Sequence, residues 1–361
     1  MRRFWAGSFV SLCLAHAAYA ADQPVQAPPP AWVKPVALPA APGASGAAVQ
    51  ILLQDQQMNV TAEGLEVYAE TATRIQTSQG LAAVGTLQIP WKPSTDTLTI
   101  HKVQILRDGR VIDVLAGQSF TVLRREMNLE YAALDGVLTA TLQPEDLRVG
   151  DILSLAFSIR RVDPVLKGMT DWSLEGPADY PVAHMSLRAR WSHDVAMHWQ
   201  ASEALKDMKQ ARDGDAVEVA MAQDDVQPLV QPAGAPLRFV QLRRAEFSNF
   251  PSWGAVSGLM YPLFVKAAVL PDRSPLKAEA ARLKAASPDR KAQAAAALAL
   301  VQDHIRYVFL GLNDGGLVPA TADETWSRRF GDCKAKTVLL LALLHELDIP
   351  AEAVLVNTPG R

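Results

Sequence analysis

A cysteine near the carboxyl end of the chain is the residue best placed to do chemistry. Cys333 follows Gly331 and Asp332 and leads into a leucine-rich run. Asp332 can cap free backbone N–H groups and Gly331 permits a tight, even left-handed turn, so a helix is predicted to begin at or beside Cys333. The positive end of the helix dipole, together with Lys334 and Lys336, would favour the nucleophilic thiolate over the thiol.

The rest of this helix predicts how the thiol is held. Residues 338–347 are apolar on nearly every face, which is typical of a helix buried at the centre of a domain. Such burial would fix the position of the sulfur atom. The alternative is a structural residue, because most isolated cysteines are small, buried and inert.

The amino terminus indicates the compartment in which this thiol would work. Arg2 and Arg3 precede an apolar stretch over residues 4–15 and small residues at Ala18-Tyr19-Ala20. This pattern is typical of a secretory signal peptide over residues 1–20, cleaved after Ala20, and it predicts a periplasmic or secreted protein. Cys13 would be removed with it, so Cys333 would be the one cysteine of the mature chain. An unpaired thiol in an oxidising compartment favours a functional role over a structural one.

These residues resemble a known family. The run from Arg328 to Thr337, followed by Ile349-Pro350-Ala351, resembles the nucleophile segment of bacterial transglutaminase-like proteins, a branch of the papain-like cysteine enzymes. Residues 305–308 and 315–319 resemble that family too, and the region before them resembles the DUF3857 domain that commonly precedes it. The resemblance spans about Leu52 to Arg361. It implies a Cys333 nucleophile that forms a thioester with an amide carbonyl and passes the acyl group to an amine or to water.

The same resemblance raises a difficulty. The family carries its histidine base and the aspartate that orients it on strands that come after the nucleophile helix. In this sequence one predicted strand, residues 351–357, follows the helix before the chain stops at Arg361. His345 lies about 18 Å along the helix from Cys333, and nothing in the motif places His304 beside it. The sequence therefore predicts the first part of a longer enzyme, or a chain that is inactive by itself.

Composition excludes several classes of protein. The 35 basic and 38 acidic residues leave a net charge of −3, which provides neither a basic surface for nucleic acid nor a polybasic membrane patch. With 49% hydrophobic residues the chain can bury a sizeable core, and its length predicts two domains. After residue 20 no apolar run is long enough to span a bilayer. The Cys-His mechanism implies no cofactor, and no metal site is predicted.

Four segments are predicted along the chain. Residues 1–20 form the signal peptide, and residues 21–48, rich in proline and alanine, are predicted to be a linker or disordered arm. Residues 51–247 form a β-rich, DUF3857-like domain, and residues 251–361 form the amino-terminal part of a transglutaminase-like domain. The fold class is α+β: an antiparallel β-sandwich-like domain followed by the helical first half of a papain/transglutaminase-like domain.

Local signals support this division. Asp108-Gly109 between two β-type runs predicts a hairpin. Residues 152–160 alternate, with Leu153, Leu155, Phe157 and Ile159 on a buried face and a serine-rich face in water. Helices are predicted to begin at Ser274-Pro275 and at Ser287-Pro288, the second with a core stripe through Ala297, Leu298 and Val301, and a capping box begins a third at Thr321. Trp326 on that third helix would line the thiol site or pack in the core.

The histidines of the β-rich region do not predict a metal site. His193 and His198 are five residues apart, which places them on opposite faces of a strand. His101 and His184 are interpreted as structural or surface residues.

Two functions remain at this stage. The first is an exported transglutaminase-like enzyme that acts on a peptide or protein amide through Cys333. The second is a non-catalytic exported binding or scaffold protein whose protein partner the sequence does not identify. The motif favours the first and the missing histidine favours the second.

Overall fold

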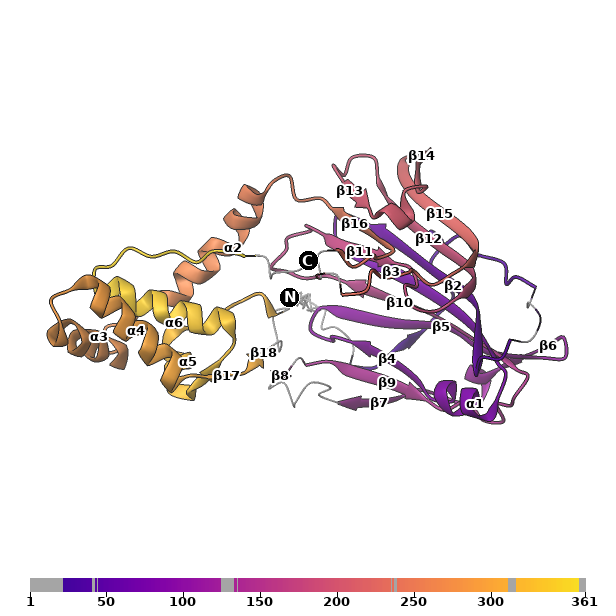
Figure 1. The fold of residues 1–361 in the computed structure, drawn as a ribbon, viewed down its shortest axis with the longest axis horizontal. Coiled ribbons are helices and arrows are strands. Elements are labelled where there is room, and N and C mark those ends of the chain that lie inside the picture. The colour runs from indigo at the N-terminus through magenta and orange to yellow at the C-terminus, as the bar shows by residue number, and fades with distance from the viewer. Residues whose placement is uncertain are drawn as a thin grey trace, which may run out of the picture.

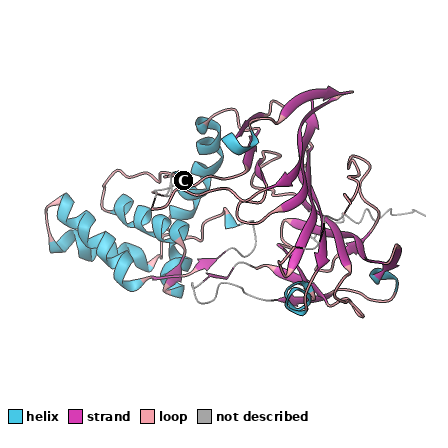
Figure 2. Cartoon of the chain, turned by 45° about the vertical axis from the view of Figure 1, so that its right-hand side comes forward, coloured by secondary structure: helices cyan, strands magenta, loops and turns pink. Residues whose placement is uncertain are grey.

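The fold, a computed structural model, is described over residues 22–40, 43, 45–124, 133–134, 136–234, 236, 239–310 and 316–356. The predicted signal peptide lies outside these residues. Long strands precede residue 249 and five α-helices follow it (Figure 1), so the α+β class predicted from the sequence is confirmed. Turning the molecule shows the long strands on one side, together with α1 (Ser78–Val84), and the helices that follow residue 249 on the other (Figure 2).

The first strands are β1 (Val25–Gln26), β2 (Val49–Val60), β3 (Leu65–Ile75), β4 (Leu87–Trp91), β5 (Asp96–Arg107), β6 (Arg110–Asp113), β7 (Thr121–Arg124), β8 (Ala133–Leu134), β9 (Leu138–Leu142) and β10 (Ile152–Arg161). They are followed by β11 (Asp171–Glu175), β12 (Val182–Ser192), β13 (His198–Ala201), β14 (Lys209–Asp213), β15 (Ala216–Val226), β16 (Arg244–Ser248), β17 (Arg306–Tyr307), β18 (Phe309–Leu310) and β19 (Phe330–Gly331). The helices are α1 (Ser78–Val84), α2 (Trp253–Ala268), α3 (Pro275–Ala286), α4 (Arg290–His304), α5 (Ala322–Arg328) and α6 (Cys333–Glu346).

A nine-stranded sheet forms the centre of the β-rich part. Its order is β1-β5-β10-β3-β2-β12-β15-β14, with β6 paired to β5. Most neighbours are antiparallel, as the sequence predicts, but β1 pairs with β5 and β12 pairs with β2 in parallel. The hairpin between β5 and β6 turns at Asp108 and Gly109, whose φ angles of 49° and 75° fit the predicted turn.

One face of this sheet is apolar and packs against two smaller sheets. The sheet β4-β9-β7 shares a core with β5, in which Trp91, Ile105 and Leu138 are buried. The sheet β11-β16-β13 shares a second core with β2 and β12, centred on Phe247 and Met185. The β-rich part is therefore layered like a sandwich.

The opposite face of the sheet differs from the sequence prediction. Ser154, Ala156 and Ser158 of β10 are at most 4% exposed, although their face is expected to be in water. The proline-rich segment 22–40 covers the polar face: Pro29 and Ala156 line one cavity together, and β1 adds to the edge of β5. The composition predicts a linker here, but Val25, Gln26, Trp32, Lys34, Val36 and Leu38 contact the sheet instead.

The helices after residue 249 form a separate apolar core. Helix α6 is central in it, because it contacts each of α2, α3, α4 and α5. Its buried residues lie all round the helix, as its sequence predicts, and are Ala335, Val338, Leu339, Leu341, Ala342 and Leu343. On α4 the predicted stripe is partly wrong, since Ala297 and Val301 are buried but Leu298 is 42% exposed and Leu300 is buried instead.

The strand predicted over residues 351–357 is not formed in the residues that the structure describes. Residues 351–356 have no regular structure, and Val354, Leu355 and Val356 are largely exposed. A strand needs a neighbour to satisfy its backbone groups, and no pairing of this segment occurs within the described residues.

Candidate functional site

Cys333 is the first residue of α6 and is exposed. The helix behind it is packed on all sides, so the thiol combines access to solvent with a fixed backbone position. The prediction of a helix that begins at this cysteine is confirmed. Asp332 is the N-cap, and its Oδ1 accepts a hydrogen bond of 3.0 Å from the backbone N–H of Ala335.

The two lysines do not act as the sequence suggests. The Lys334 ammonium pairs with the buried carboxylate of Asp332 and lies 5.3 Å from the centre of the Phe309 ring. The Lys336 ammonium donates to the carbonyl oxygen of Ile305 at 2.7 Å. Both positive charges are thus engaged elsewhere, and the Asp332 carboxylate adds a negative charge next to Cys333. The helix N-terminus itself remains the main favourable influence on a thiolate.

Gly331 has a structural role other than the expected left-handed turn. The positive φ angle of this segment belongs to Arg329, the C-cap of α5, at 60°. A Cβ atom on Gly331 would lie 2.7 Å from Cβ of Ala335 and 3.3 Å from Cγ2 of Thr325. Glycine is therefore needed because the chain passes close to α5 and to the first turn of α6.

Tyr307 is a site residue that sequence reasoning missed. Strands β17 and β19 pair in parallel, with Tyr307 opposite Gly331, and the backbone N–H of Val308 donates to the Gly331 carbonyl at 3.1 Å. Partial burial raises the pKa of Tyr307, and its interactions with the adjacent Cys333 and Asp332 raise it further. The phenol therefore stays a neutral donor beside the sulfur. No local signal marks this contact, because it depends on pairing across 24 residues, from 307 to 331.

Trp326 belongs to the core rather than to an open wall of the site. It is buried on α5 among the apolar residues of the helical part. The guanidinium carbon of Arg329 lies 3.6 Å from the centre of its ring, which adds a cation–π contact. Of the two predicted roles, the structure supports packing.

The β-rich part reaches the strand that adjoins this site. Strand β8 pairs in parallel with β18, with Ala133 opposite Phe309 and Leu134 opposite Leu310. Phe309 carries the ring beneath the Lys334 ammonium. A loop segment of the first part of the chain is therefore hydrogen-bonded to the strand beside the cysteine.

A base for Cys333 is absent from the part of the chain that the structure describes. His304 ends α4 and His345 lies in the last turn of α6, both exposed, and neither has a hydrogen bond or ion pair to Cys333. His101, His184 and His193 bond to other groups in the β-rich part. No cluster of three or more ligating side chains suited to a metal ion occurs among the described residues.

Taken together, these residues provide a nucleophile and a hydrogen-bond donor. An exposed thiol at a helix N-terminus can attack a carbonyl carbon, and the Tyr307 hydroxyl can donate to the sulfur or to an oxygen that becomes negative. Among the described residues no histidine lies beside Cys333 to return a proton to a leaving amine. None of the helices described is long and apolar enough to cross a membrane.

Comparison with known proteins supports the predicted family resemblance of the β-rich part but not that of the helical part. Residues 63–230 match the family model of DUF3857, a domain of unknown function with a solved structure. This match confirms the predicted resemblance of the β-rich region. It does not reach the helical part, and no curated protein matches the chain.

One solved structure shares the fold over most of the chain. A candidate protease from Parabacteroides distasonis is 14% identical, with a TM-score of 0.65, over 84% of this chain and 59% of that one. Since residues 1–250 are roughly seven tenths of the 361 residues, the shared fold must include helical residues. The chain spans about three fifths of the length of that structure.

Two further matches carry no argument because their TM-scores are low. Aminopeptidase A from Legionella pneumophila, crystallised with aspartic acid, is 7% identical over 57% of this chain and 22% of that one, with a TM-score of 0.30. An M1 zinc metallopeptidase from Deinococcus radiodurans is 12% identical over 56% of this chain and 42% of that one, with a TM-score of 0.28.

Proposed function

We propose that Cys333 is the nucleophile of a transglutaminase-like centre for thiol-dependent transfer or hydrolysis of amide acyl groups. The observation that carries this proposal is the exposed thiol at the first residue of α6, the central helix of the helical core. The motif around Gly331, Asp332 and Cys333 supports it, as does the Tyr307 hydroxyl beside the sulfur. The fold shared with a candidate protease is consistent with peptide chemistry.

The proposed reaction has two steps. The thiolate attacks the amide carbonyl, the C–N bond breaks, and the amine leaves with a proton while a thioester forms on Cys333. An amine or water then attacks the thioester and releases the thiol. The first step needs an acid for the leaving amine. The described residues place no histidine beside Cys333, and a phenol whose pKa is raised is a weak acid, so we expect the 361-residue chain to be acylated without turning over amides.

This chemistry gives a direct test on the chain beginning at Ala21, in which Cys333 is the one cysteine. A p-nitrophenyl ester releases a phenolate that needs no proton, so it should acylate Cys333 with one equivalent of p-nitrophenol per chain. The matched control is Cys333→Ala combined with Ala296→Cys, which places an exposed thiol in the middle of α4. We expect Cys333 to react at least fivefold faster than this control thiol, because only Cys333 has the helix N-terminus.

The tyrosine provides a second variant for the same assay. Tyr307→Phe removes one hydrogen bond to a charged group, which is worth about 1.5 kcal/mol or more and predicts an acylation rate about tenfold lower. Mass spectrometry of the protein should locate the acyl group on Cys333. Equal rates for Cys333 and the control thiol would contradict the nucleophile proposal.

We also propose that the protein is exported and that it has the two domains predicted from its sequence. The signal pattern at residues 1–20 supports export, and mass spectrometry of protein from the periplasm should find Ala21 at the amino terminus. An amino terminus at Met1 in that fraction would contradict this proposal.

A further inference from the structure

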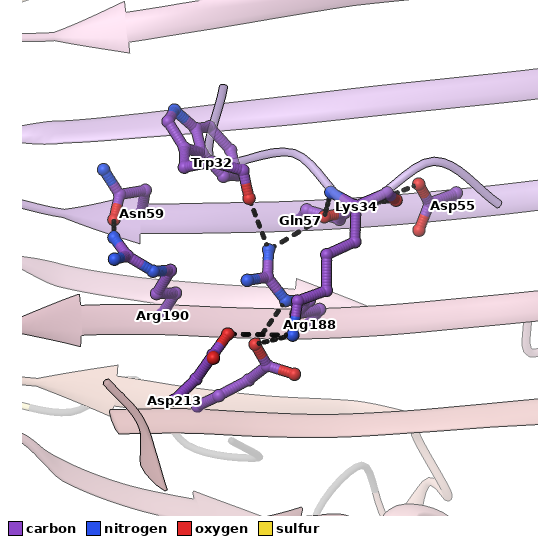
Figure 3. A network of polar contacts seen from close by, with 9 residues as sticks. Trp32, Lys34, Asp55, Gln57, Asn59, Arg188, Arg190 and Asp213 are labelled. Atoms are coloured by element: carbon purple, nitrogen blue, oxygen red, sulfur yellow. Dashed lines mark hydrogen bonds and ion pairs between the residues drawn. The ribbon is translucent and has the colours of Figure 1, made fainter. Parts of the chain in front are cut away.

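The polar face of the nine-stranded sheet binds the main chain of the amino-terminal arm (Figure 3). Gln57, on β2, is 1% exposed; its amide nitrogen donates to the carbonyl oxygen of Lys34 at 2.7 Å, and its amide oxygen accepts from the Lys34 N–H at 3.0 Å. Arg188, on β12, donates to the carbonyl oxygen of Trp32 at 2.9 Å and to the Gln57 amide oxygen at 3.0 Å. These contacts bind main-chain groups of the arm and do not depend on its side chains.

The start of the arm is held in a similar way. Strand β1 adds to β5 in parallel, with Val25 opposite Thr99. Just beyond it, Nδ1 of His101 lies 2.9 Å from the carbonyl oxygen of Ala27. Addition of a strand to a sheet edge is a recurring mode of peptide recognition in which backbone hydrogen bonds provide affinity.

Two side chains of the arm are recognised through charge and hydrogen bonding. The Lys34 ammonium lies 2.9 Å from Glu218 and 3.0 Å from Asp213. The indole N–H of Trp32 donates to Glu66 at 2.9 Å. Acidic groups on the sheet thus select a lysine and an N–H donor two residues apart, where the arm makes a turn in which the Val33 N–H donates to the Pro30 carbonyl oxygen at 3.0 Å.

The two ends of the arm rest on surfaces of different character. Residues 25–35 lie over polar side chains that water could solvate in their absence. Val36 and Leu38 instead pack on the buried apolar residues Leu52, Leu53 and Ala72. Hydrogen bonds and ion pairs hold the first part, although its half-buried Trp32 and Val33 would lose apolar burial on release, while apolar packing anchors the second part.

The arm does not fill the space that it covers. A cavity of about 500 Å³ lies between Pro30 and Val33 of the arm and Tyr68, Glu70 and Lys102 of the sheet. These polar groups bond to one another, since the Tyr68 hydroxyl donates to Glu70 at 2.6 Å and the Lys102 ammonium pairs with Glu70. A segment with larger polar side chains would occupy the same track more completely.

We propose that this polar face is a binding groove for a proline-containing polypeptide segment of another protein, which would follow the path of the arm with its turn at residues 30–33 and carry a lysine at the position of Lys34. Residues 25–35 of the chain occupy the groove as an intramolecular competitor. The groove is independent of the Cys333 centre, and its test does not depend on acylation.

The test keeps the complete chain during folding. A protease site is inserted after Pro35 in the chain beginning at Ala21, and the folded protein is cut so that residues 21–35 are held only by noncovalent contacts. Binding of a fluorescein-labelled peptide of residues 22–35 is measured by anisotropy. We expect binding to the cut protein to be at least tenfold tighter than to the uncut protein, because a tethered arm competes at an effective concentration near millimolar.

Two glutamines of β2 provide a matched pair of variants. Gln57→Ala removes two hydrogen bonds to the Lys34 main chain and should weaken peptide binding about thirtyfold, since such bonds contribute roughly 1 kcal/mol each. Gln54→Ala changes the opposite face of the same strand and should leave binding unchanged. Equal binding to the cut and uncut proteins, or equal loss in both variants, would overturn the proposal.

A final comparison distinguishes a groove that binds a segment of another protein from a groove that binds only the arm of this chain. A peptide in which Val25, Gln26, Ala27 and Ala31 are all replaced by threonine keeps the backbone, the prolines, Trp32 and Lys34, and should bind within threefold of the native peptide. Strict dependence on the native sequence would show that the groove serves the arm alone. If the uncut protein is a dimer that the peptide dissociates, the groove binds the arm of a second copy. Strict sequence dependence and such a dimer would each overturn the proposed partner.

Discussion

Gly331 provides the sharpest prediction about how the thiol is positioned. In Gly331→Ala the new methyl group would lie 2.7 Å from Cβ of Ala335 and 3.3 Å from Cγ2 of Thr325. Neither neighbour has room to move, because Ala335 is 2% exposed and Thr325 is fully buried. The first turn of α6 must therefore shift away from α5. Overpacking of this kind costs about 1–3 kcal/mol, of which the lower flexibility of the unfolded chain offsets about 0.4–1 kcal/mol.

The matched control is Gly258→Ala in the middle of α2. No atom lies within 4 Å of the Cβ position there, so the substitution should stabilise the helix by about 0.5–1 kcal/mol. In urea unfolding followed by the circular dichroism of the helices, the midpoint concentration should thus fall for Gly331→Ala and rise for Gly258→Ala. Acylation of Cys333 should slow in Gly331→Ala and stay unchanged in Gly258→Ala.

A third variant separates two explanations of this glycine. If Gly331 were needed for a left-handed backbone, asparagine would be the best replacement, since it tolerates positive φ angles. Close packing predicts the reverse, with Gly331→Asn less stable than Gly331→Ala because its side chain is larger. A Gly331→Asn protein more stable than Gly331→Ala would refute the packing argument.

Three further predictions concern charge and domain structure. Asp332→Ala removes the N-cap and should lower the free energy of unfolding by about 1 kcal/mol. Asp332→Asn keeps an acceptor but removes the negative charge, so it should raise the rate of Cys333 alkylation at pH 7 several-fold. An alkylation rate equal to that of the unmodified protein would contradict the electrostatic argument. Burial raises the pKa of Asp55 from 3.8 to about 6, so its contribution to stability is complete below pH 3.8 and is lost as the pH rises through 6. At 1.36 kcal/mol per unit, Asp55→Asn should raise the free energy of unfolding by about 2–3 kcal/mol at pH 7.5 and hardly at all at pH 3.5, and a pH-independent effect would count against this assignment. Limited proteolysis should cut between Phe250 and Trp253, which is 83% exposed, and a first cut within β5 or β10 would contradict two domains.

Features that depend on neighbours in sequence were predictable. The helix that begins at Cys333, the capping box at Thr321 and the helix start at Ser274-Pro275 are all present, because each is fixed by side chains within one turn. The Asp108-Gly109 hairpin follows from the same local chemistry.

Features that depend on distant residues were not predictable. Lys336 bonds to Ile305, 31 residues away, so its charge is not free to act on the thiol. Tyr307 reaches Cys333 only because β17 and β19 pair in parallel. On α4 the buried stripe includes Leu300 rather than Leu298, since the packing of neighbouring helices sets the rotation of the helix about its axis.

Alternation of apolar and polar residues along a strand does not show whether the polar face lies in water or under another segment of the chain, as the polar face of this sheet illustrates. Proline removes N–H donors, so a proline-rich arm cannot form a regular ladder with a sheet and offers mainly carbonyl oxygens. His101, Arg188 and Gln57 supply donors to the carbonyl oxygens of the arm. The polar side chains of such a strand face can form their hydrogen bonds equally well with water or with the main chain of another segment. The choice between them is made by a segment that lies elsewhere in the sequence, and here that segment carries Trp32 and Lys34 opposite the acidic groups that bind them.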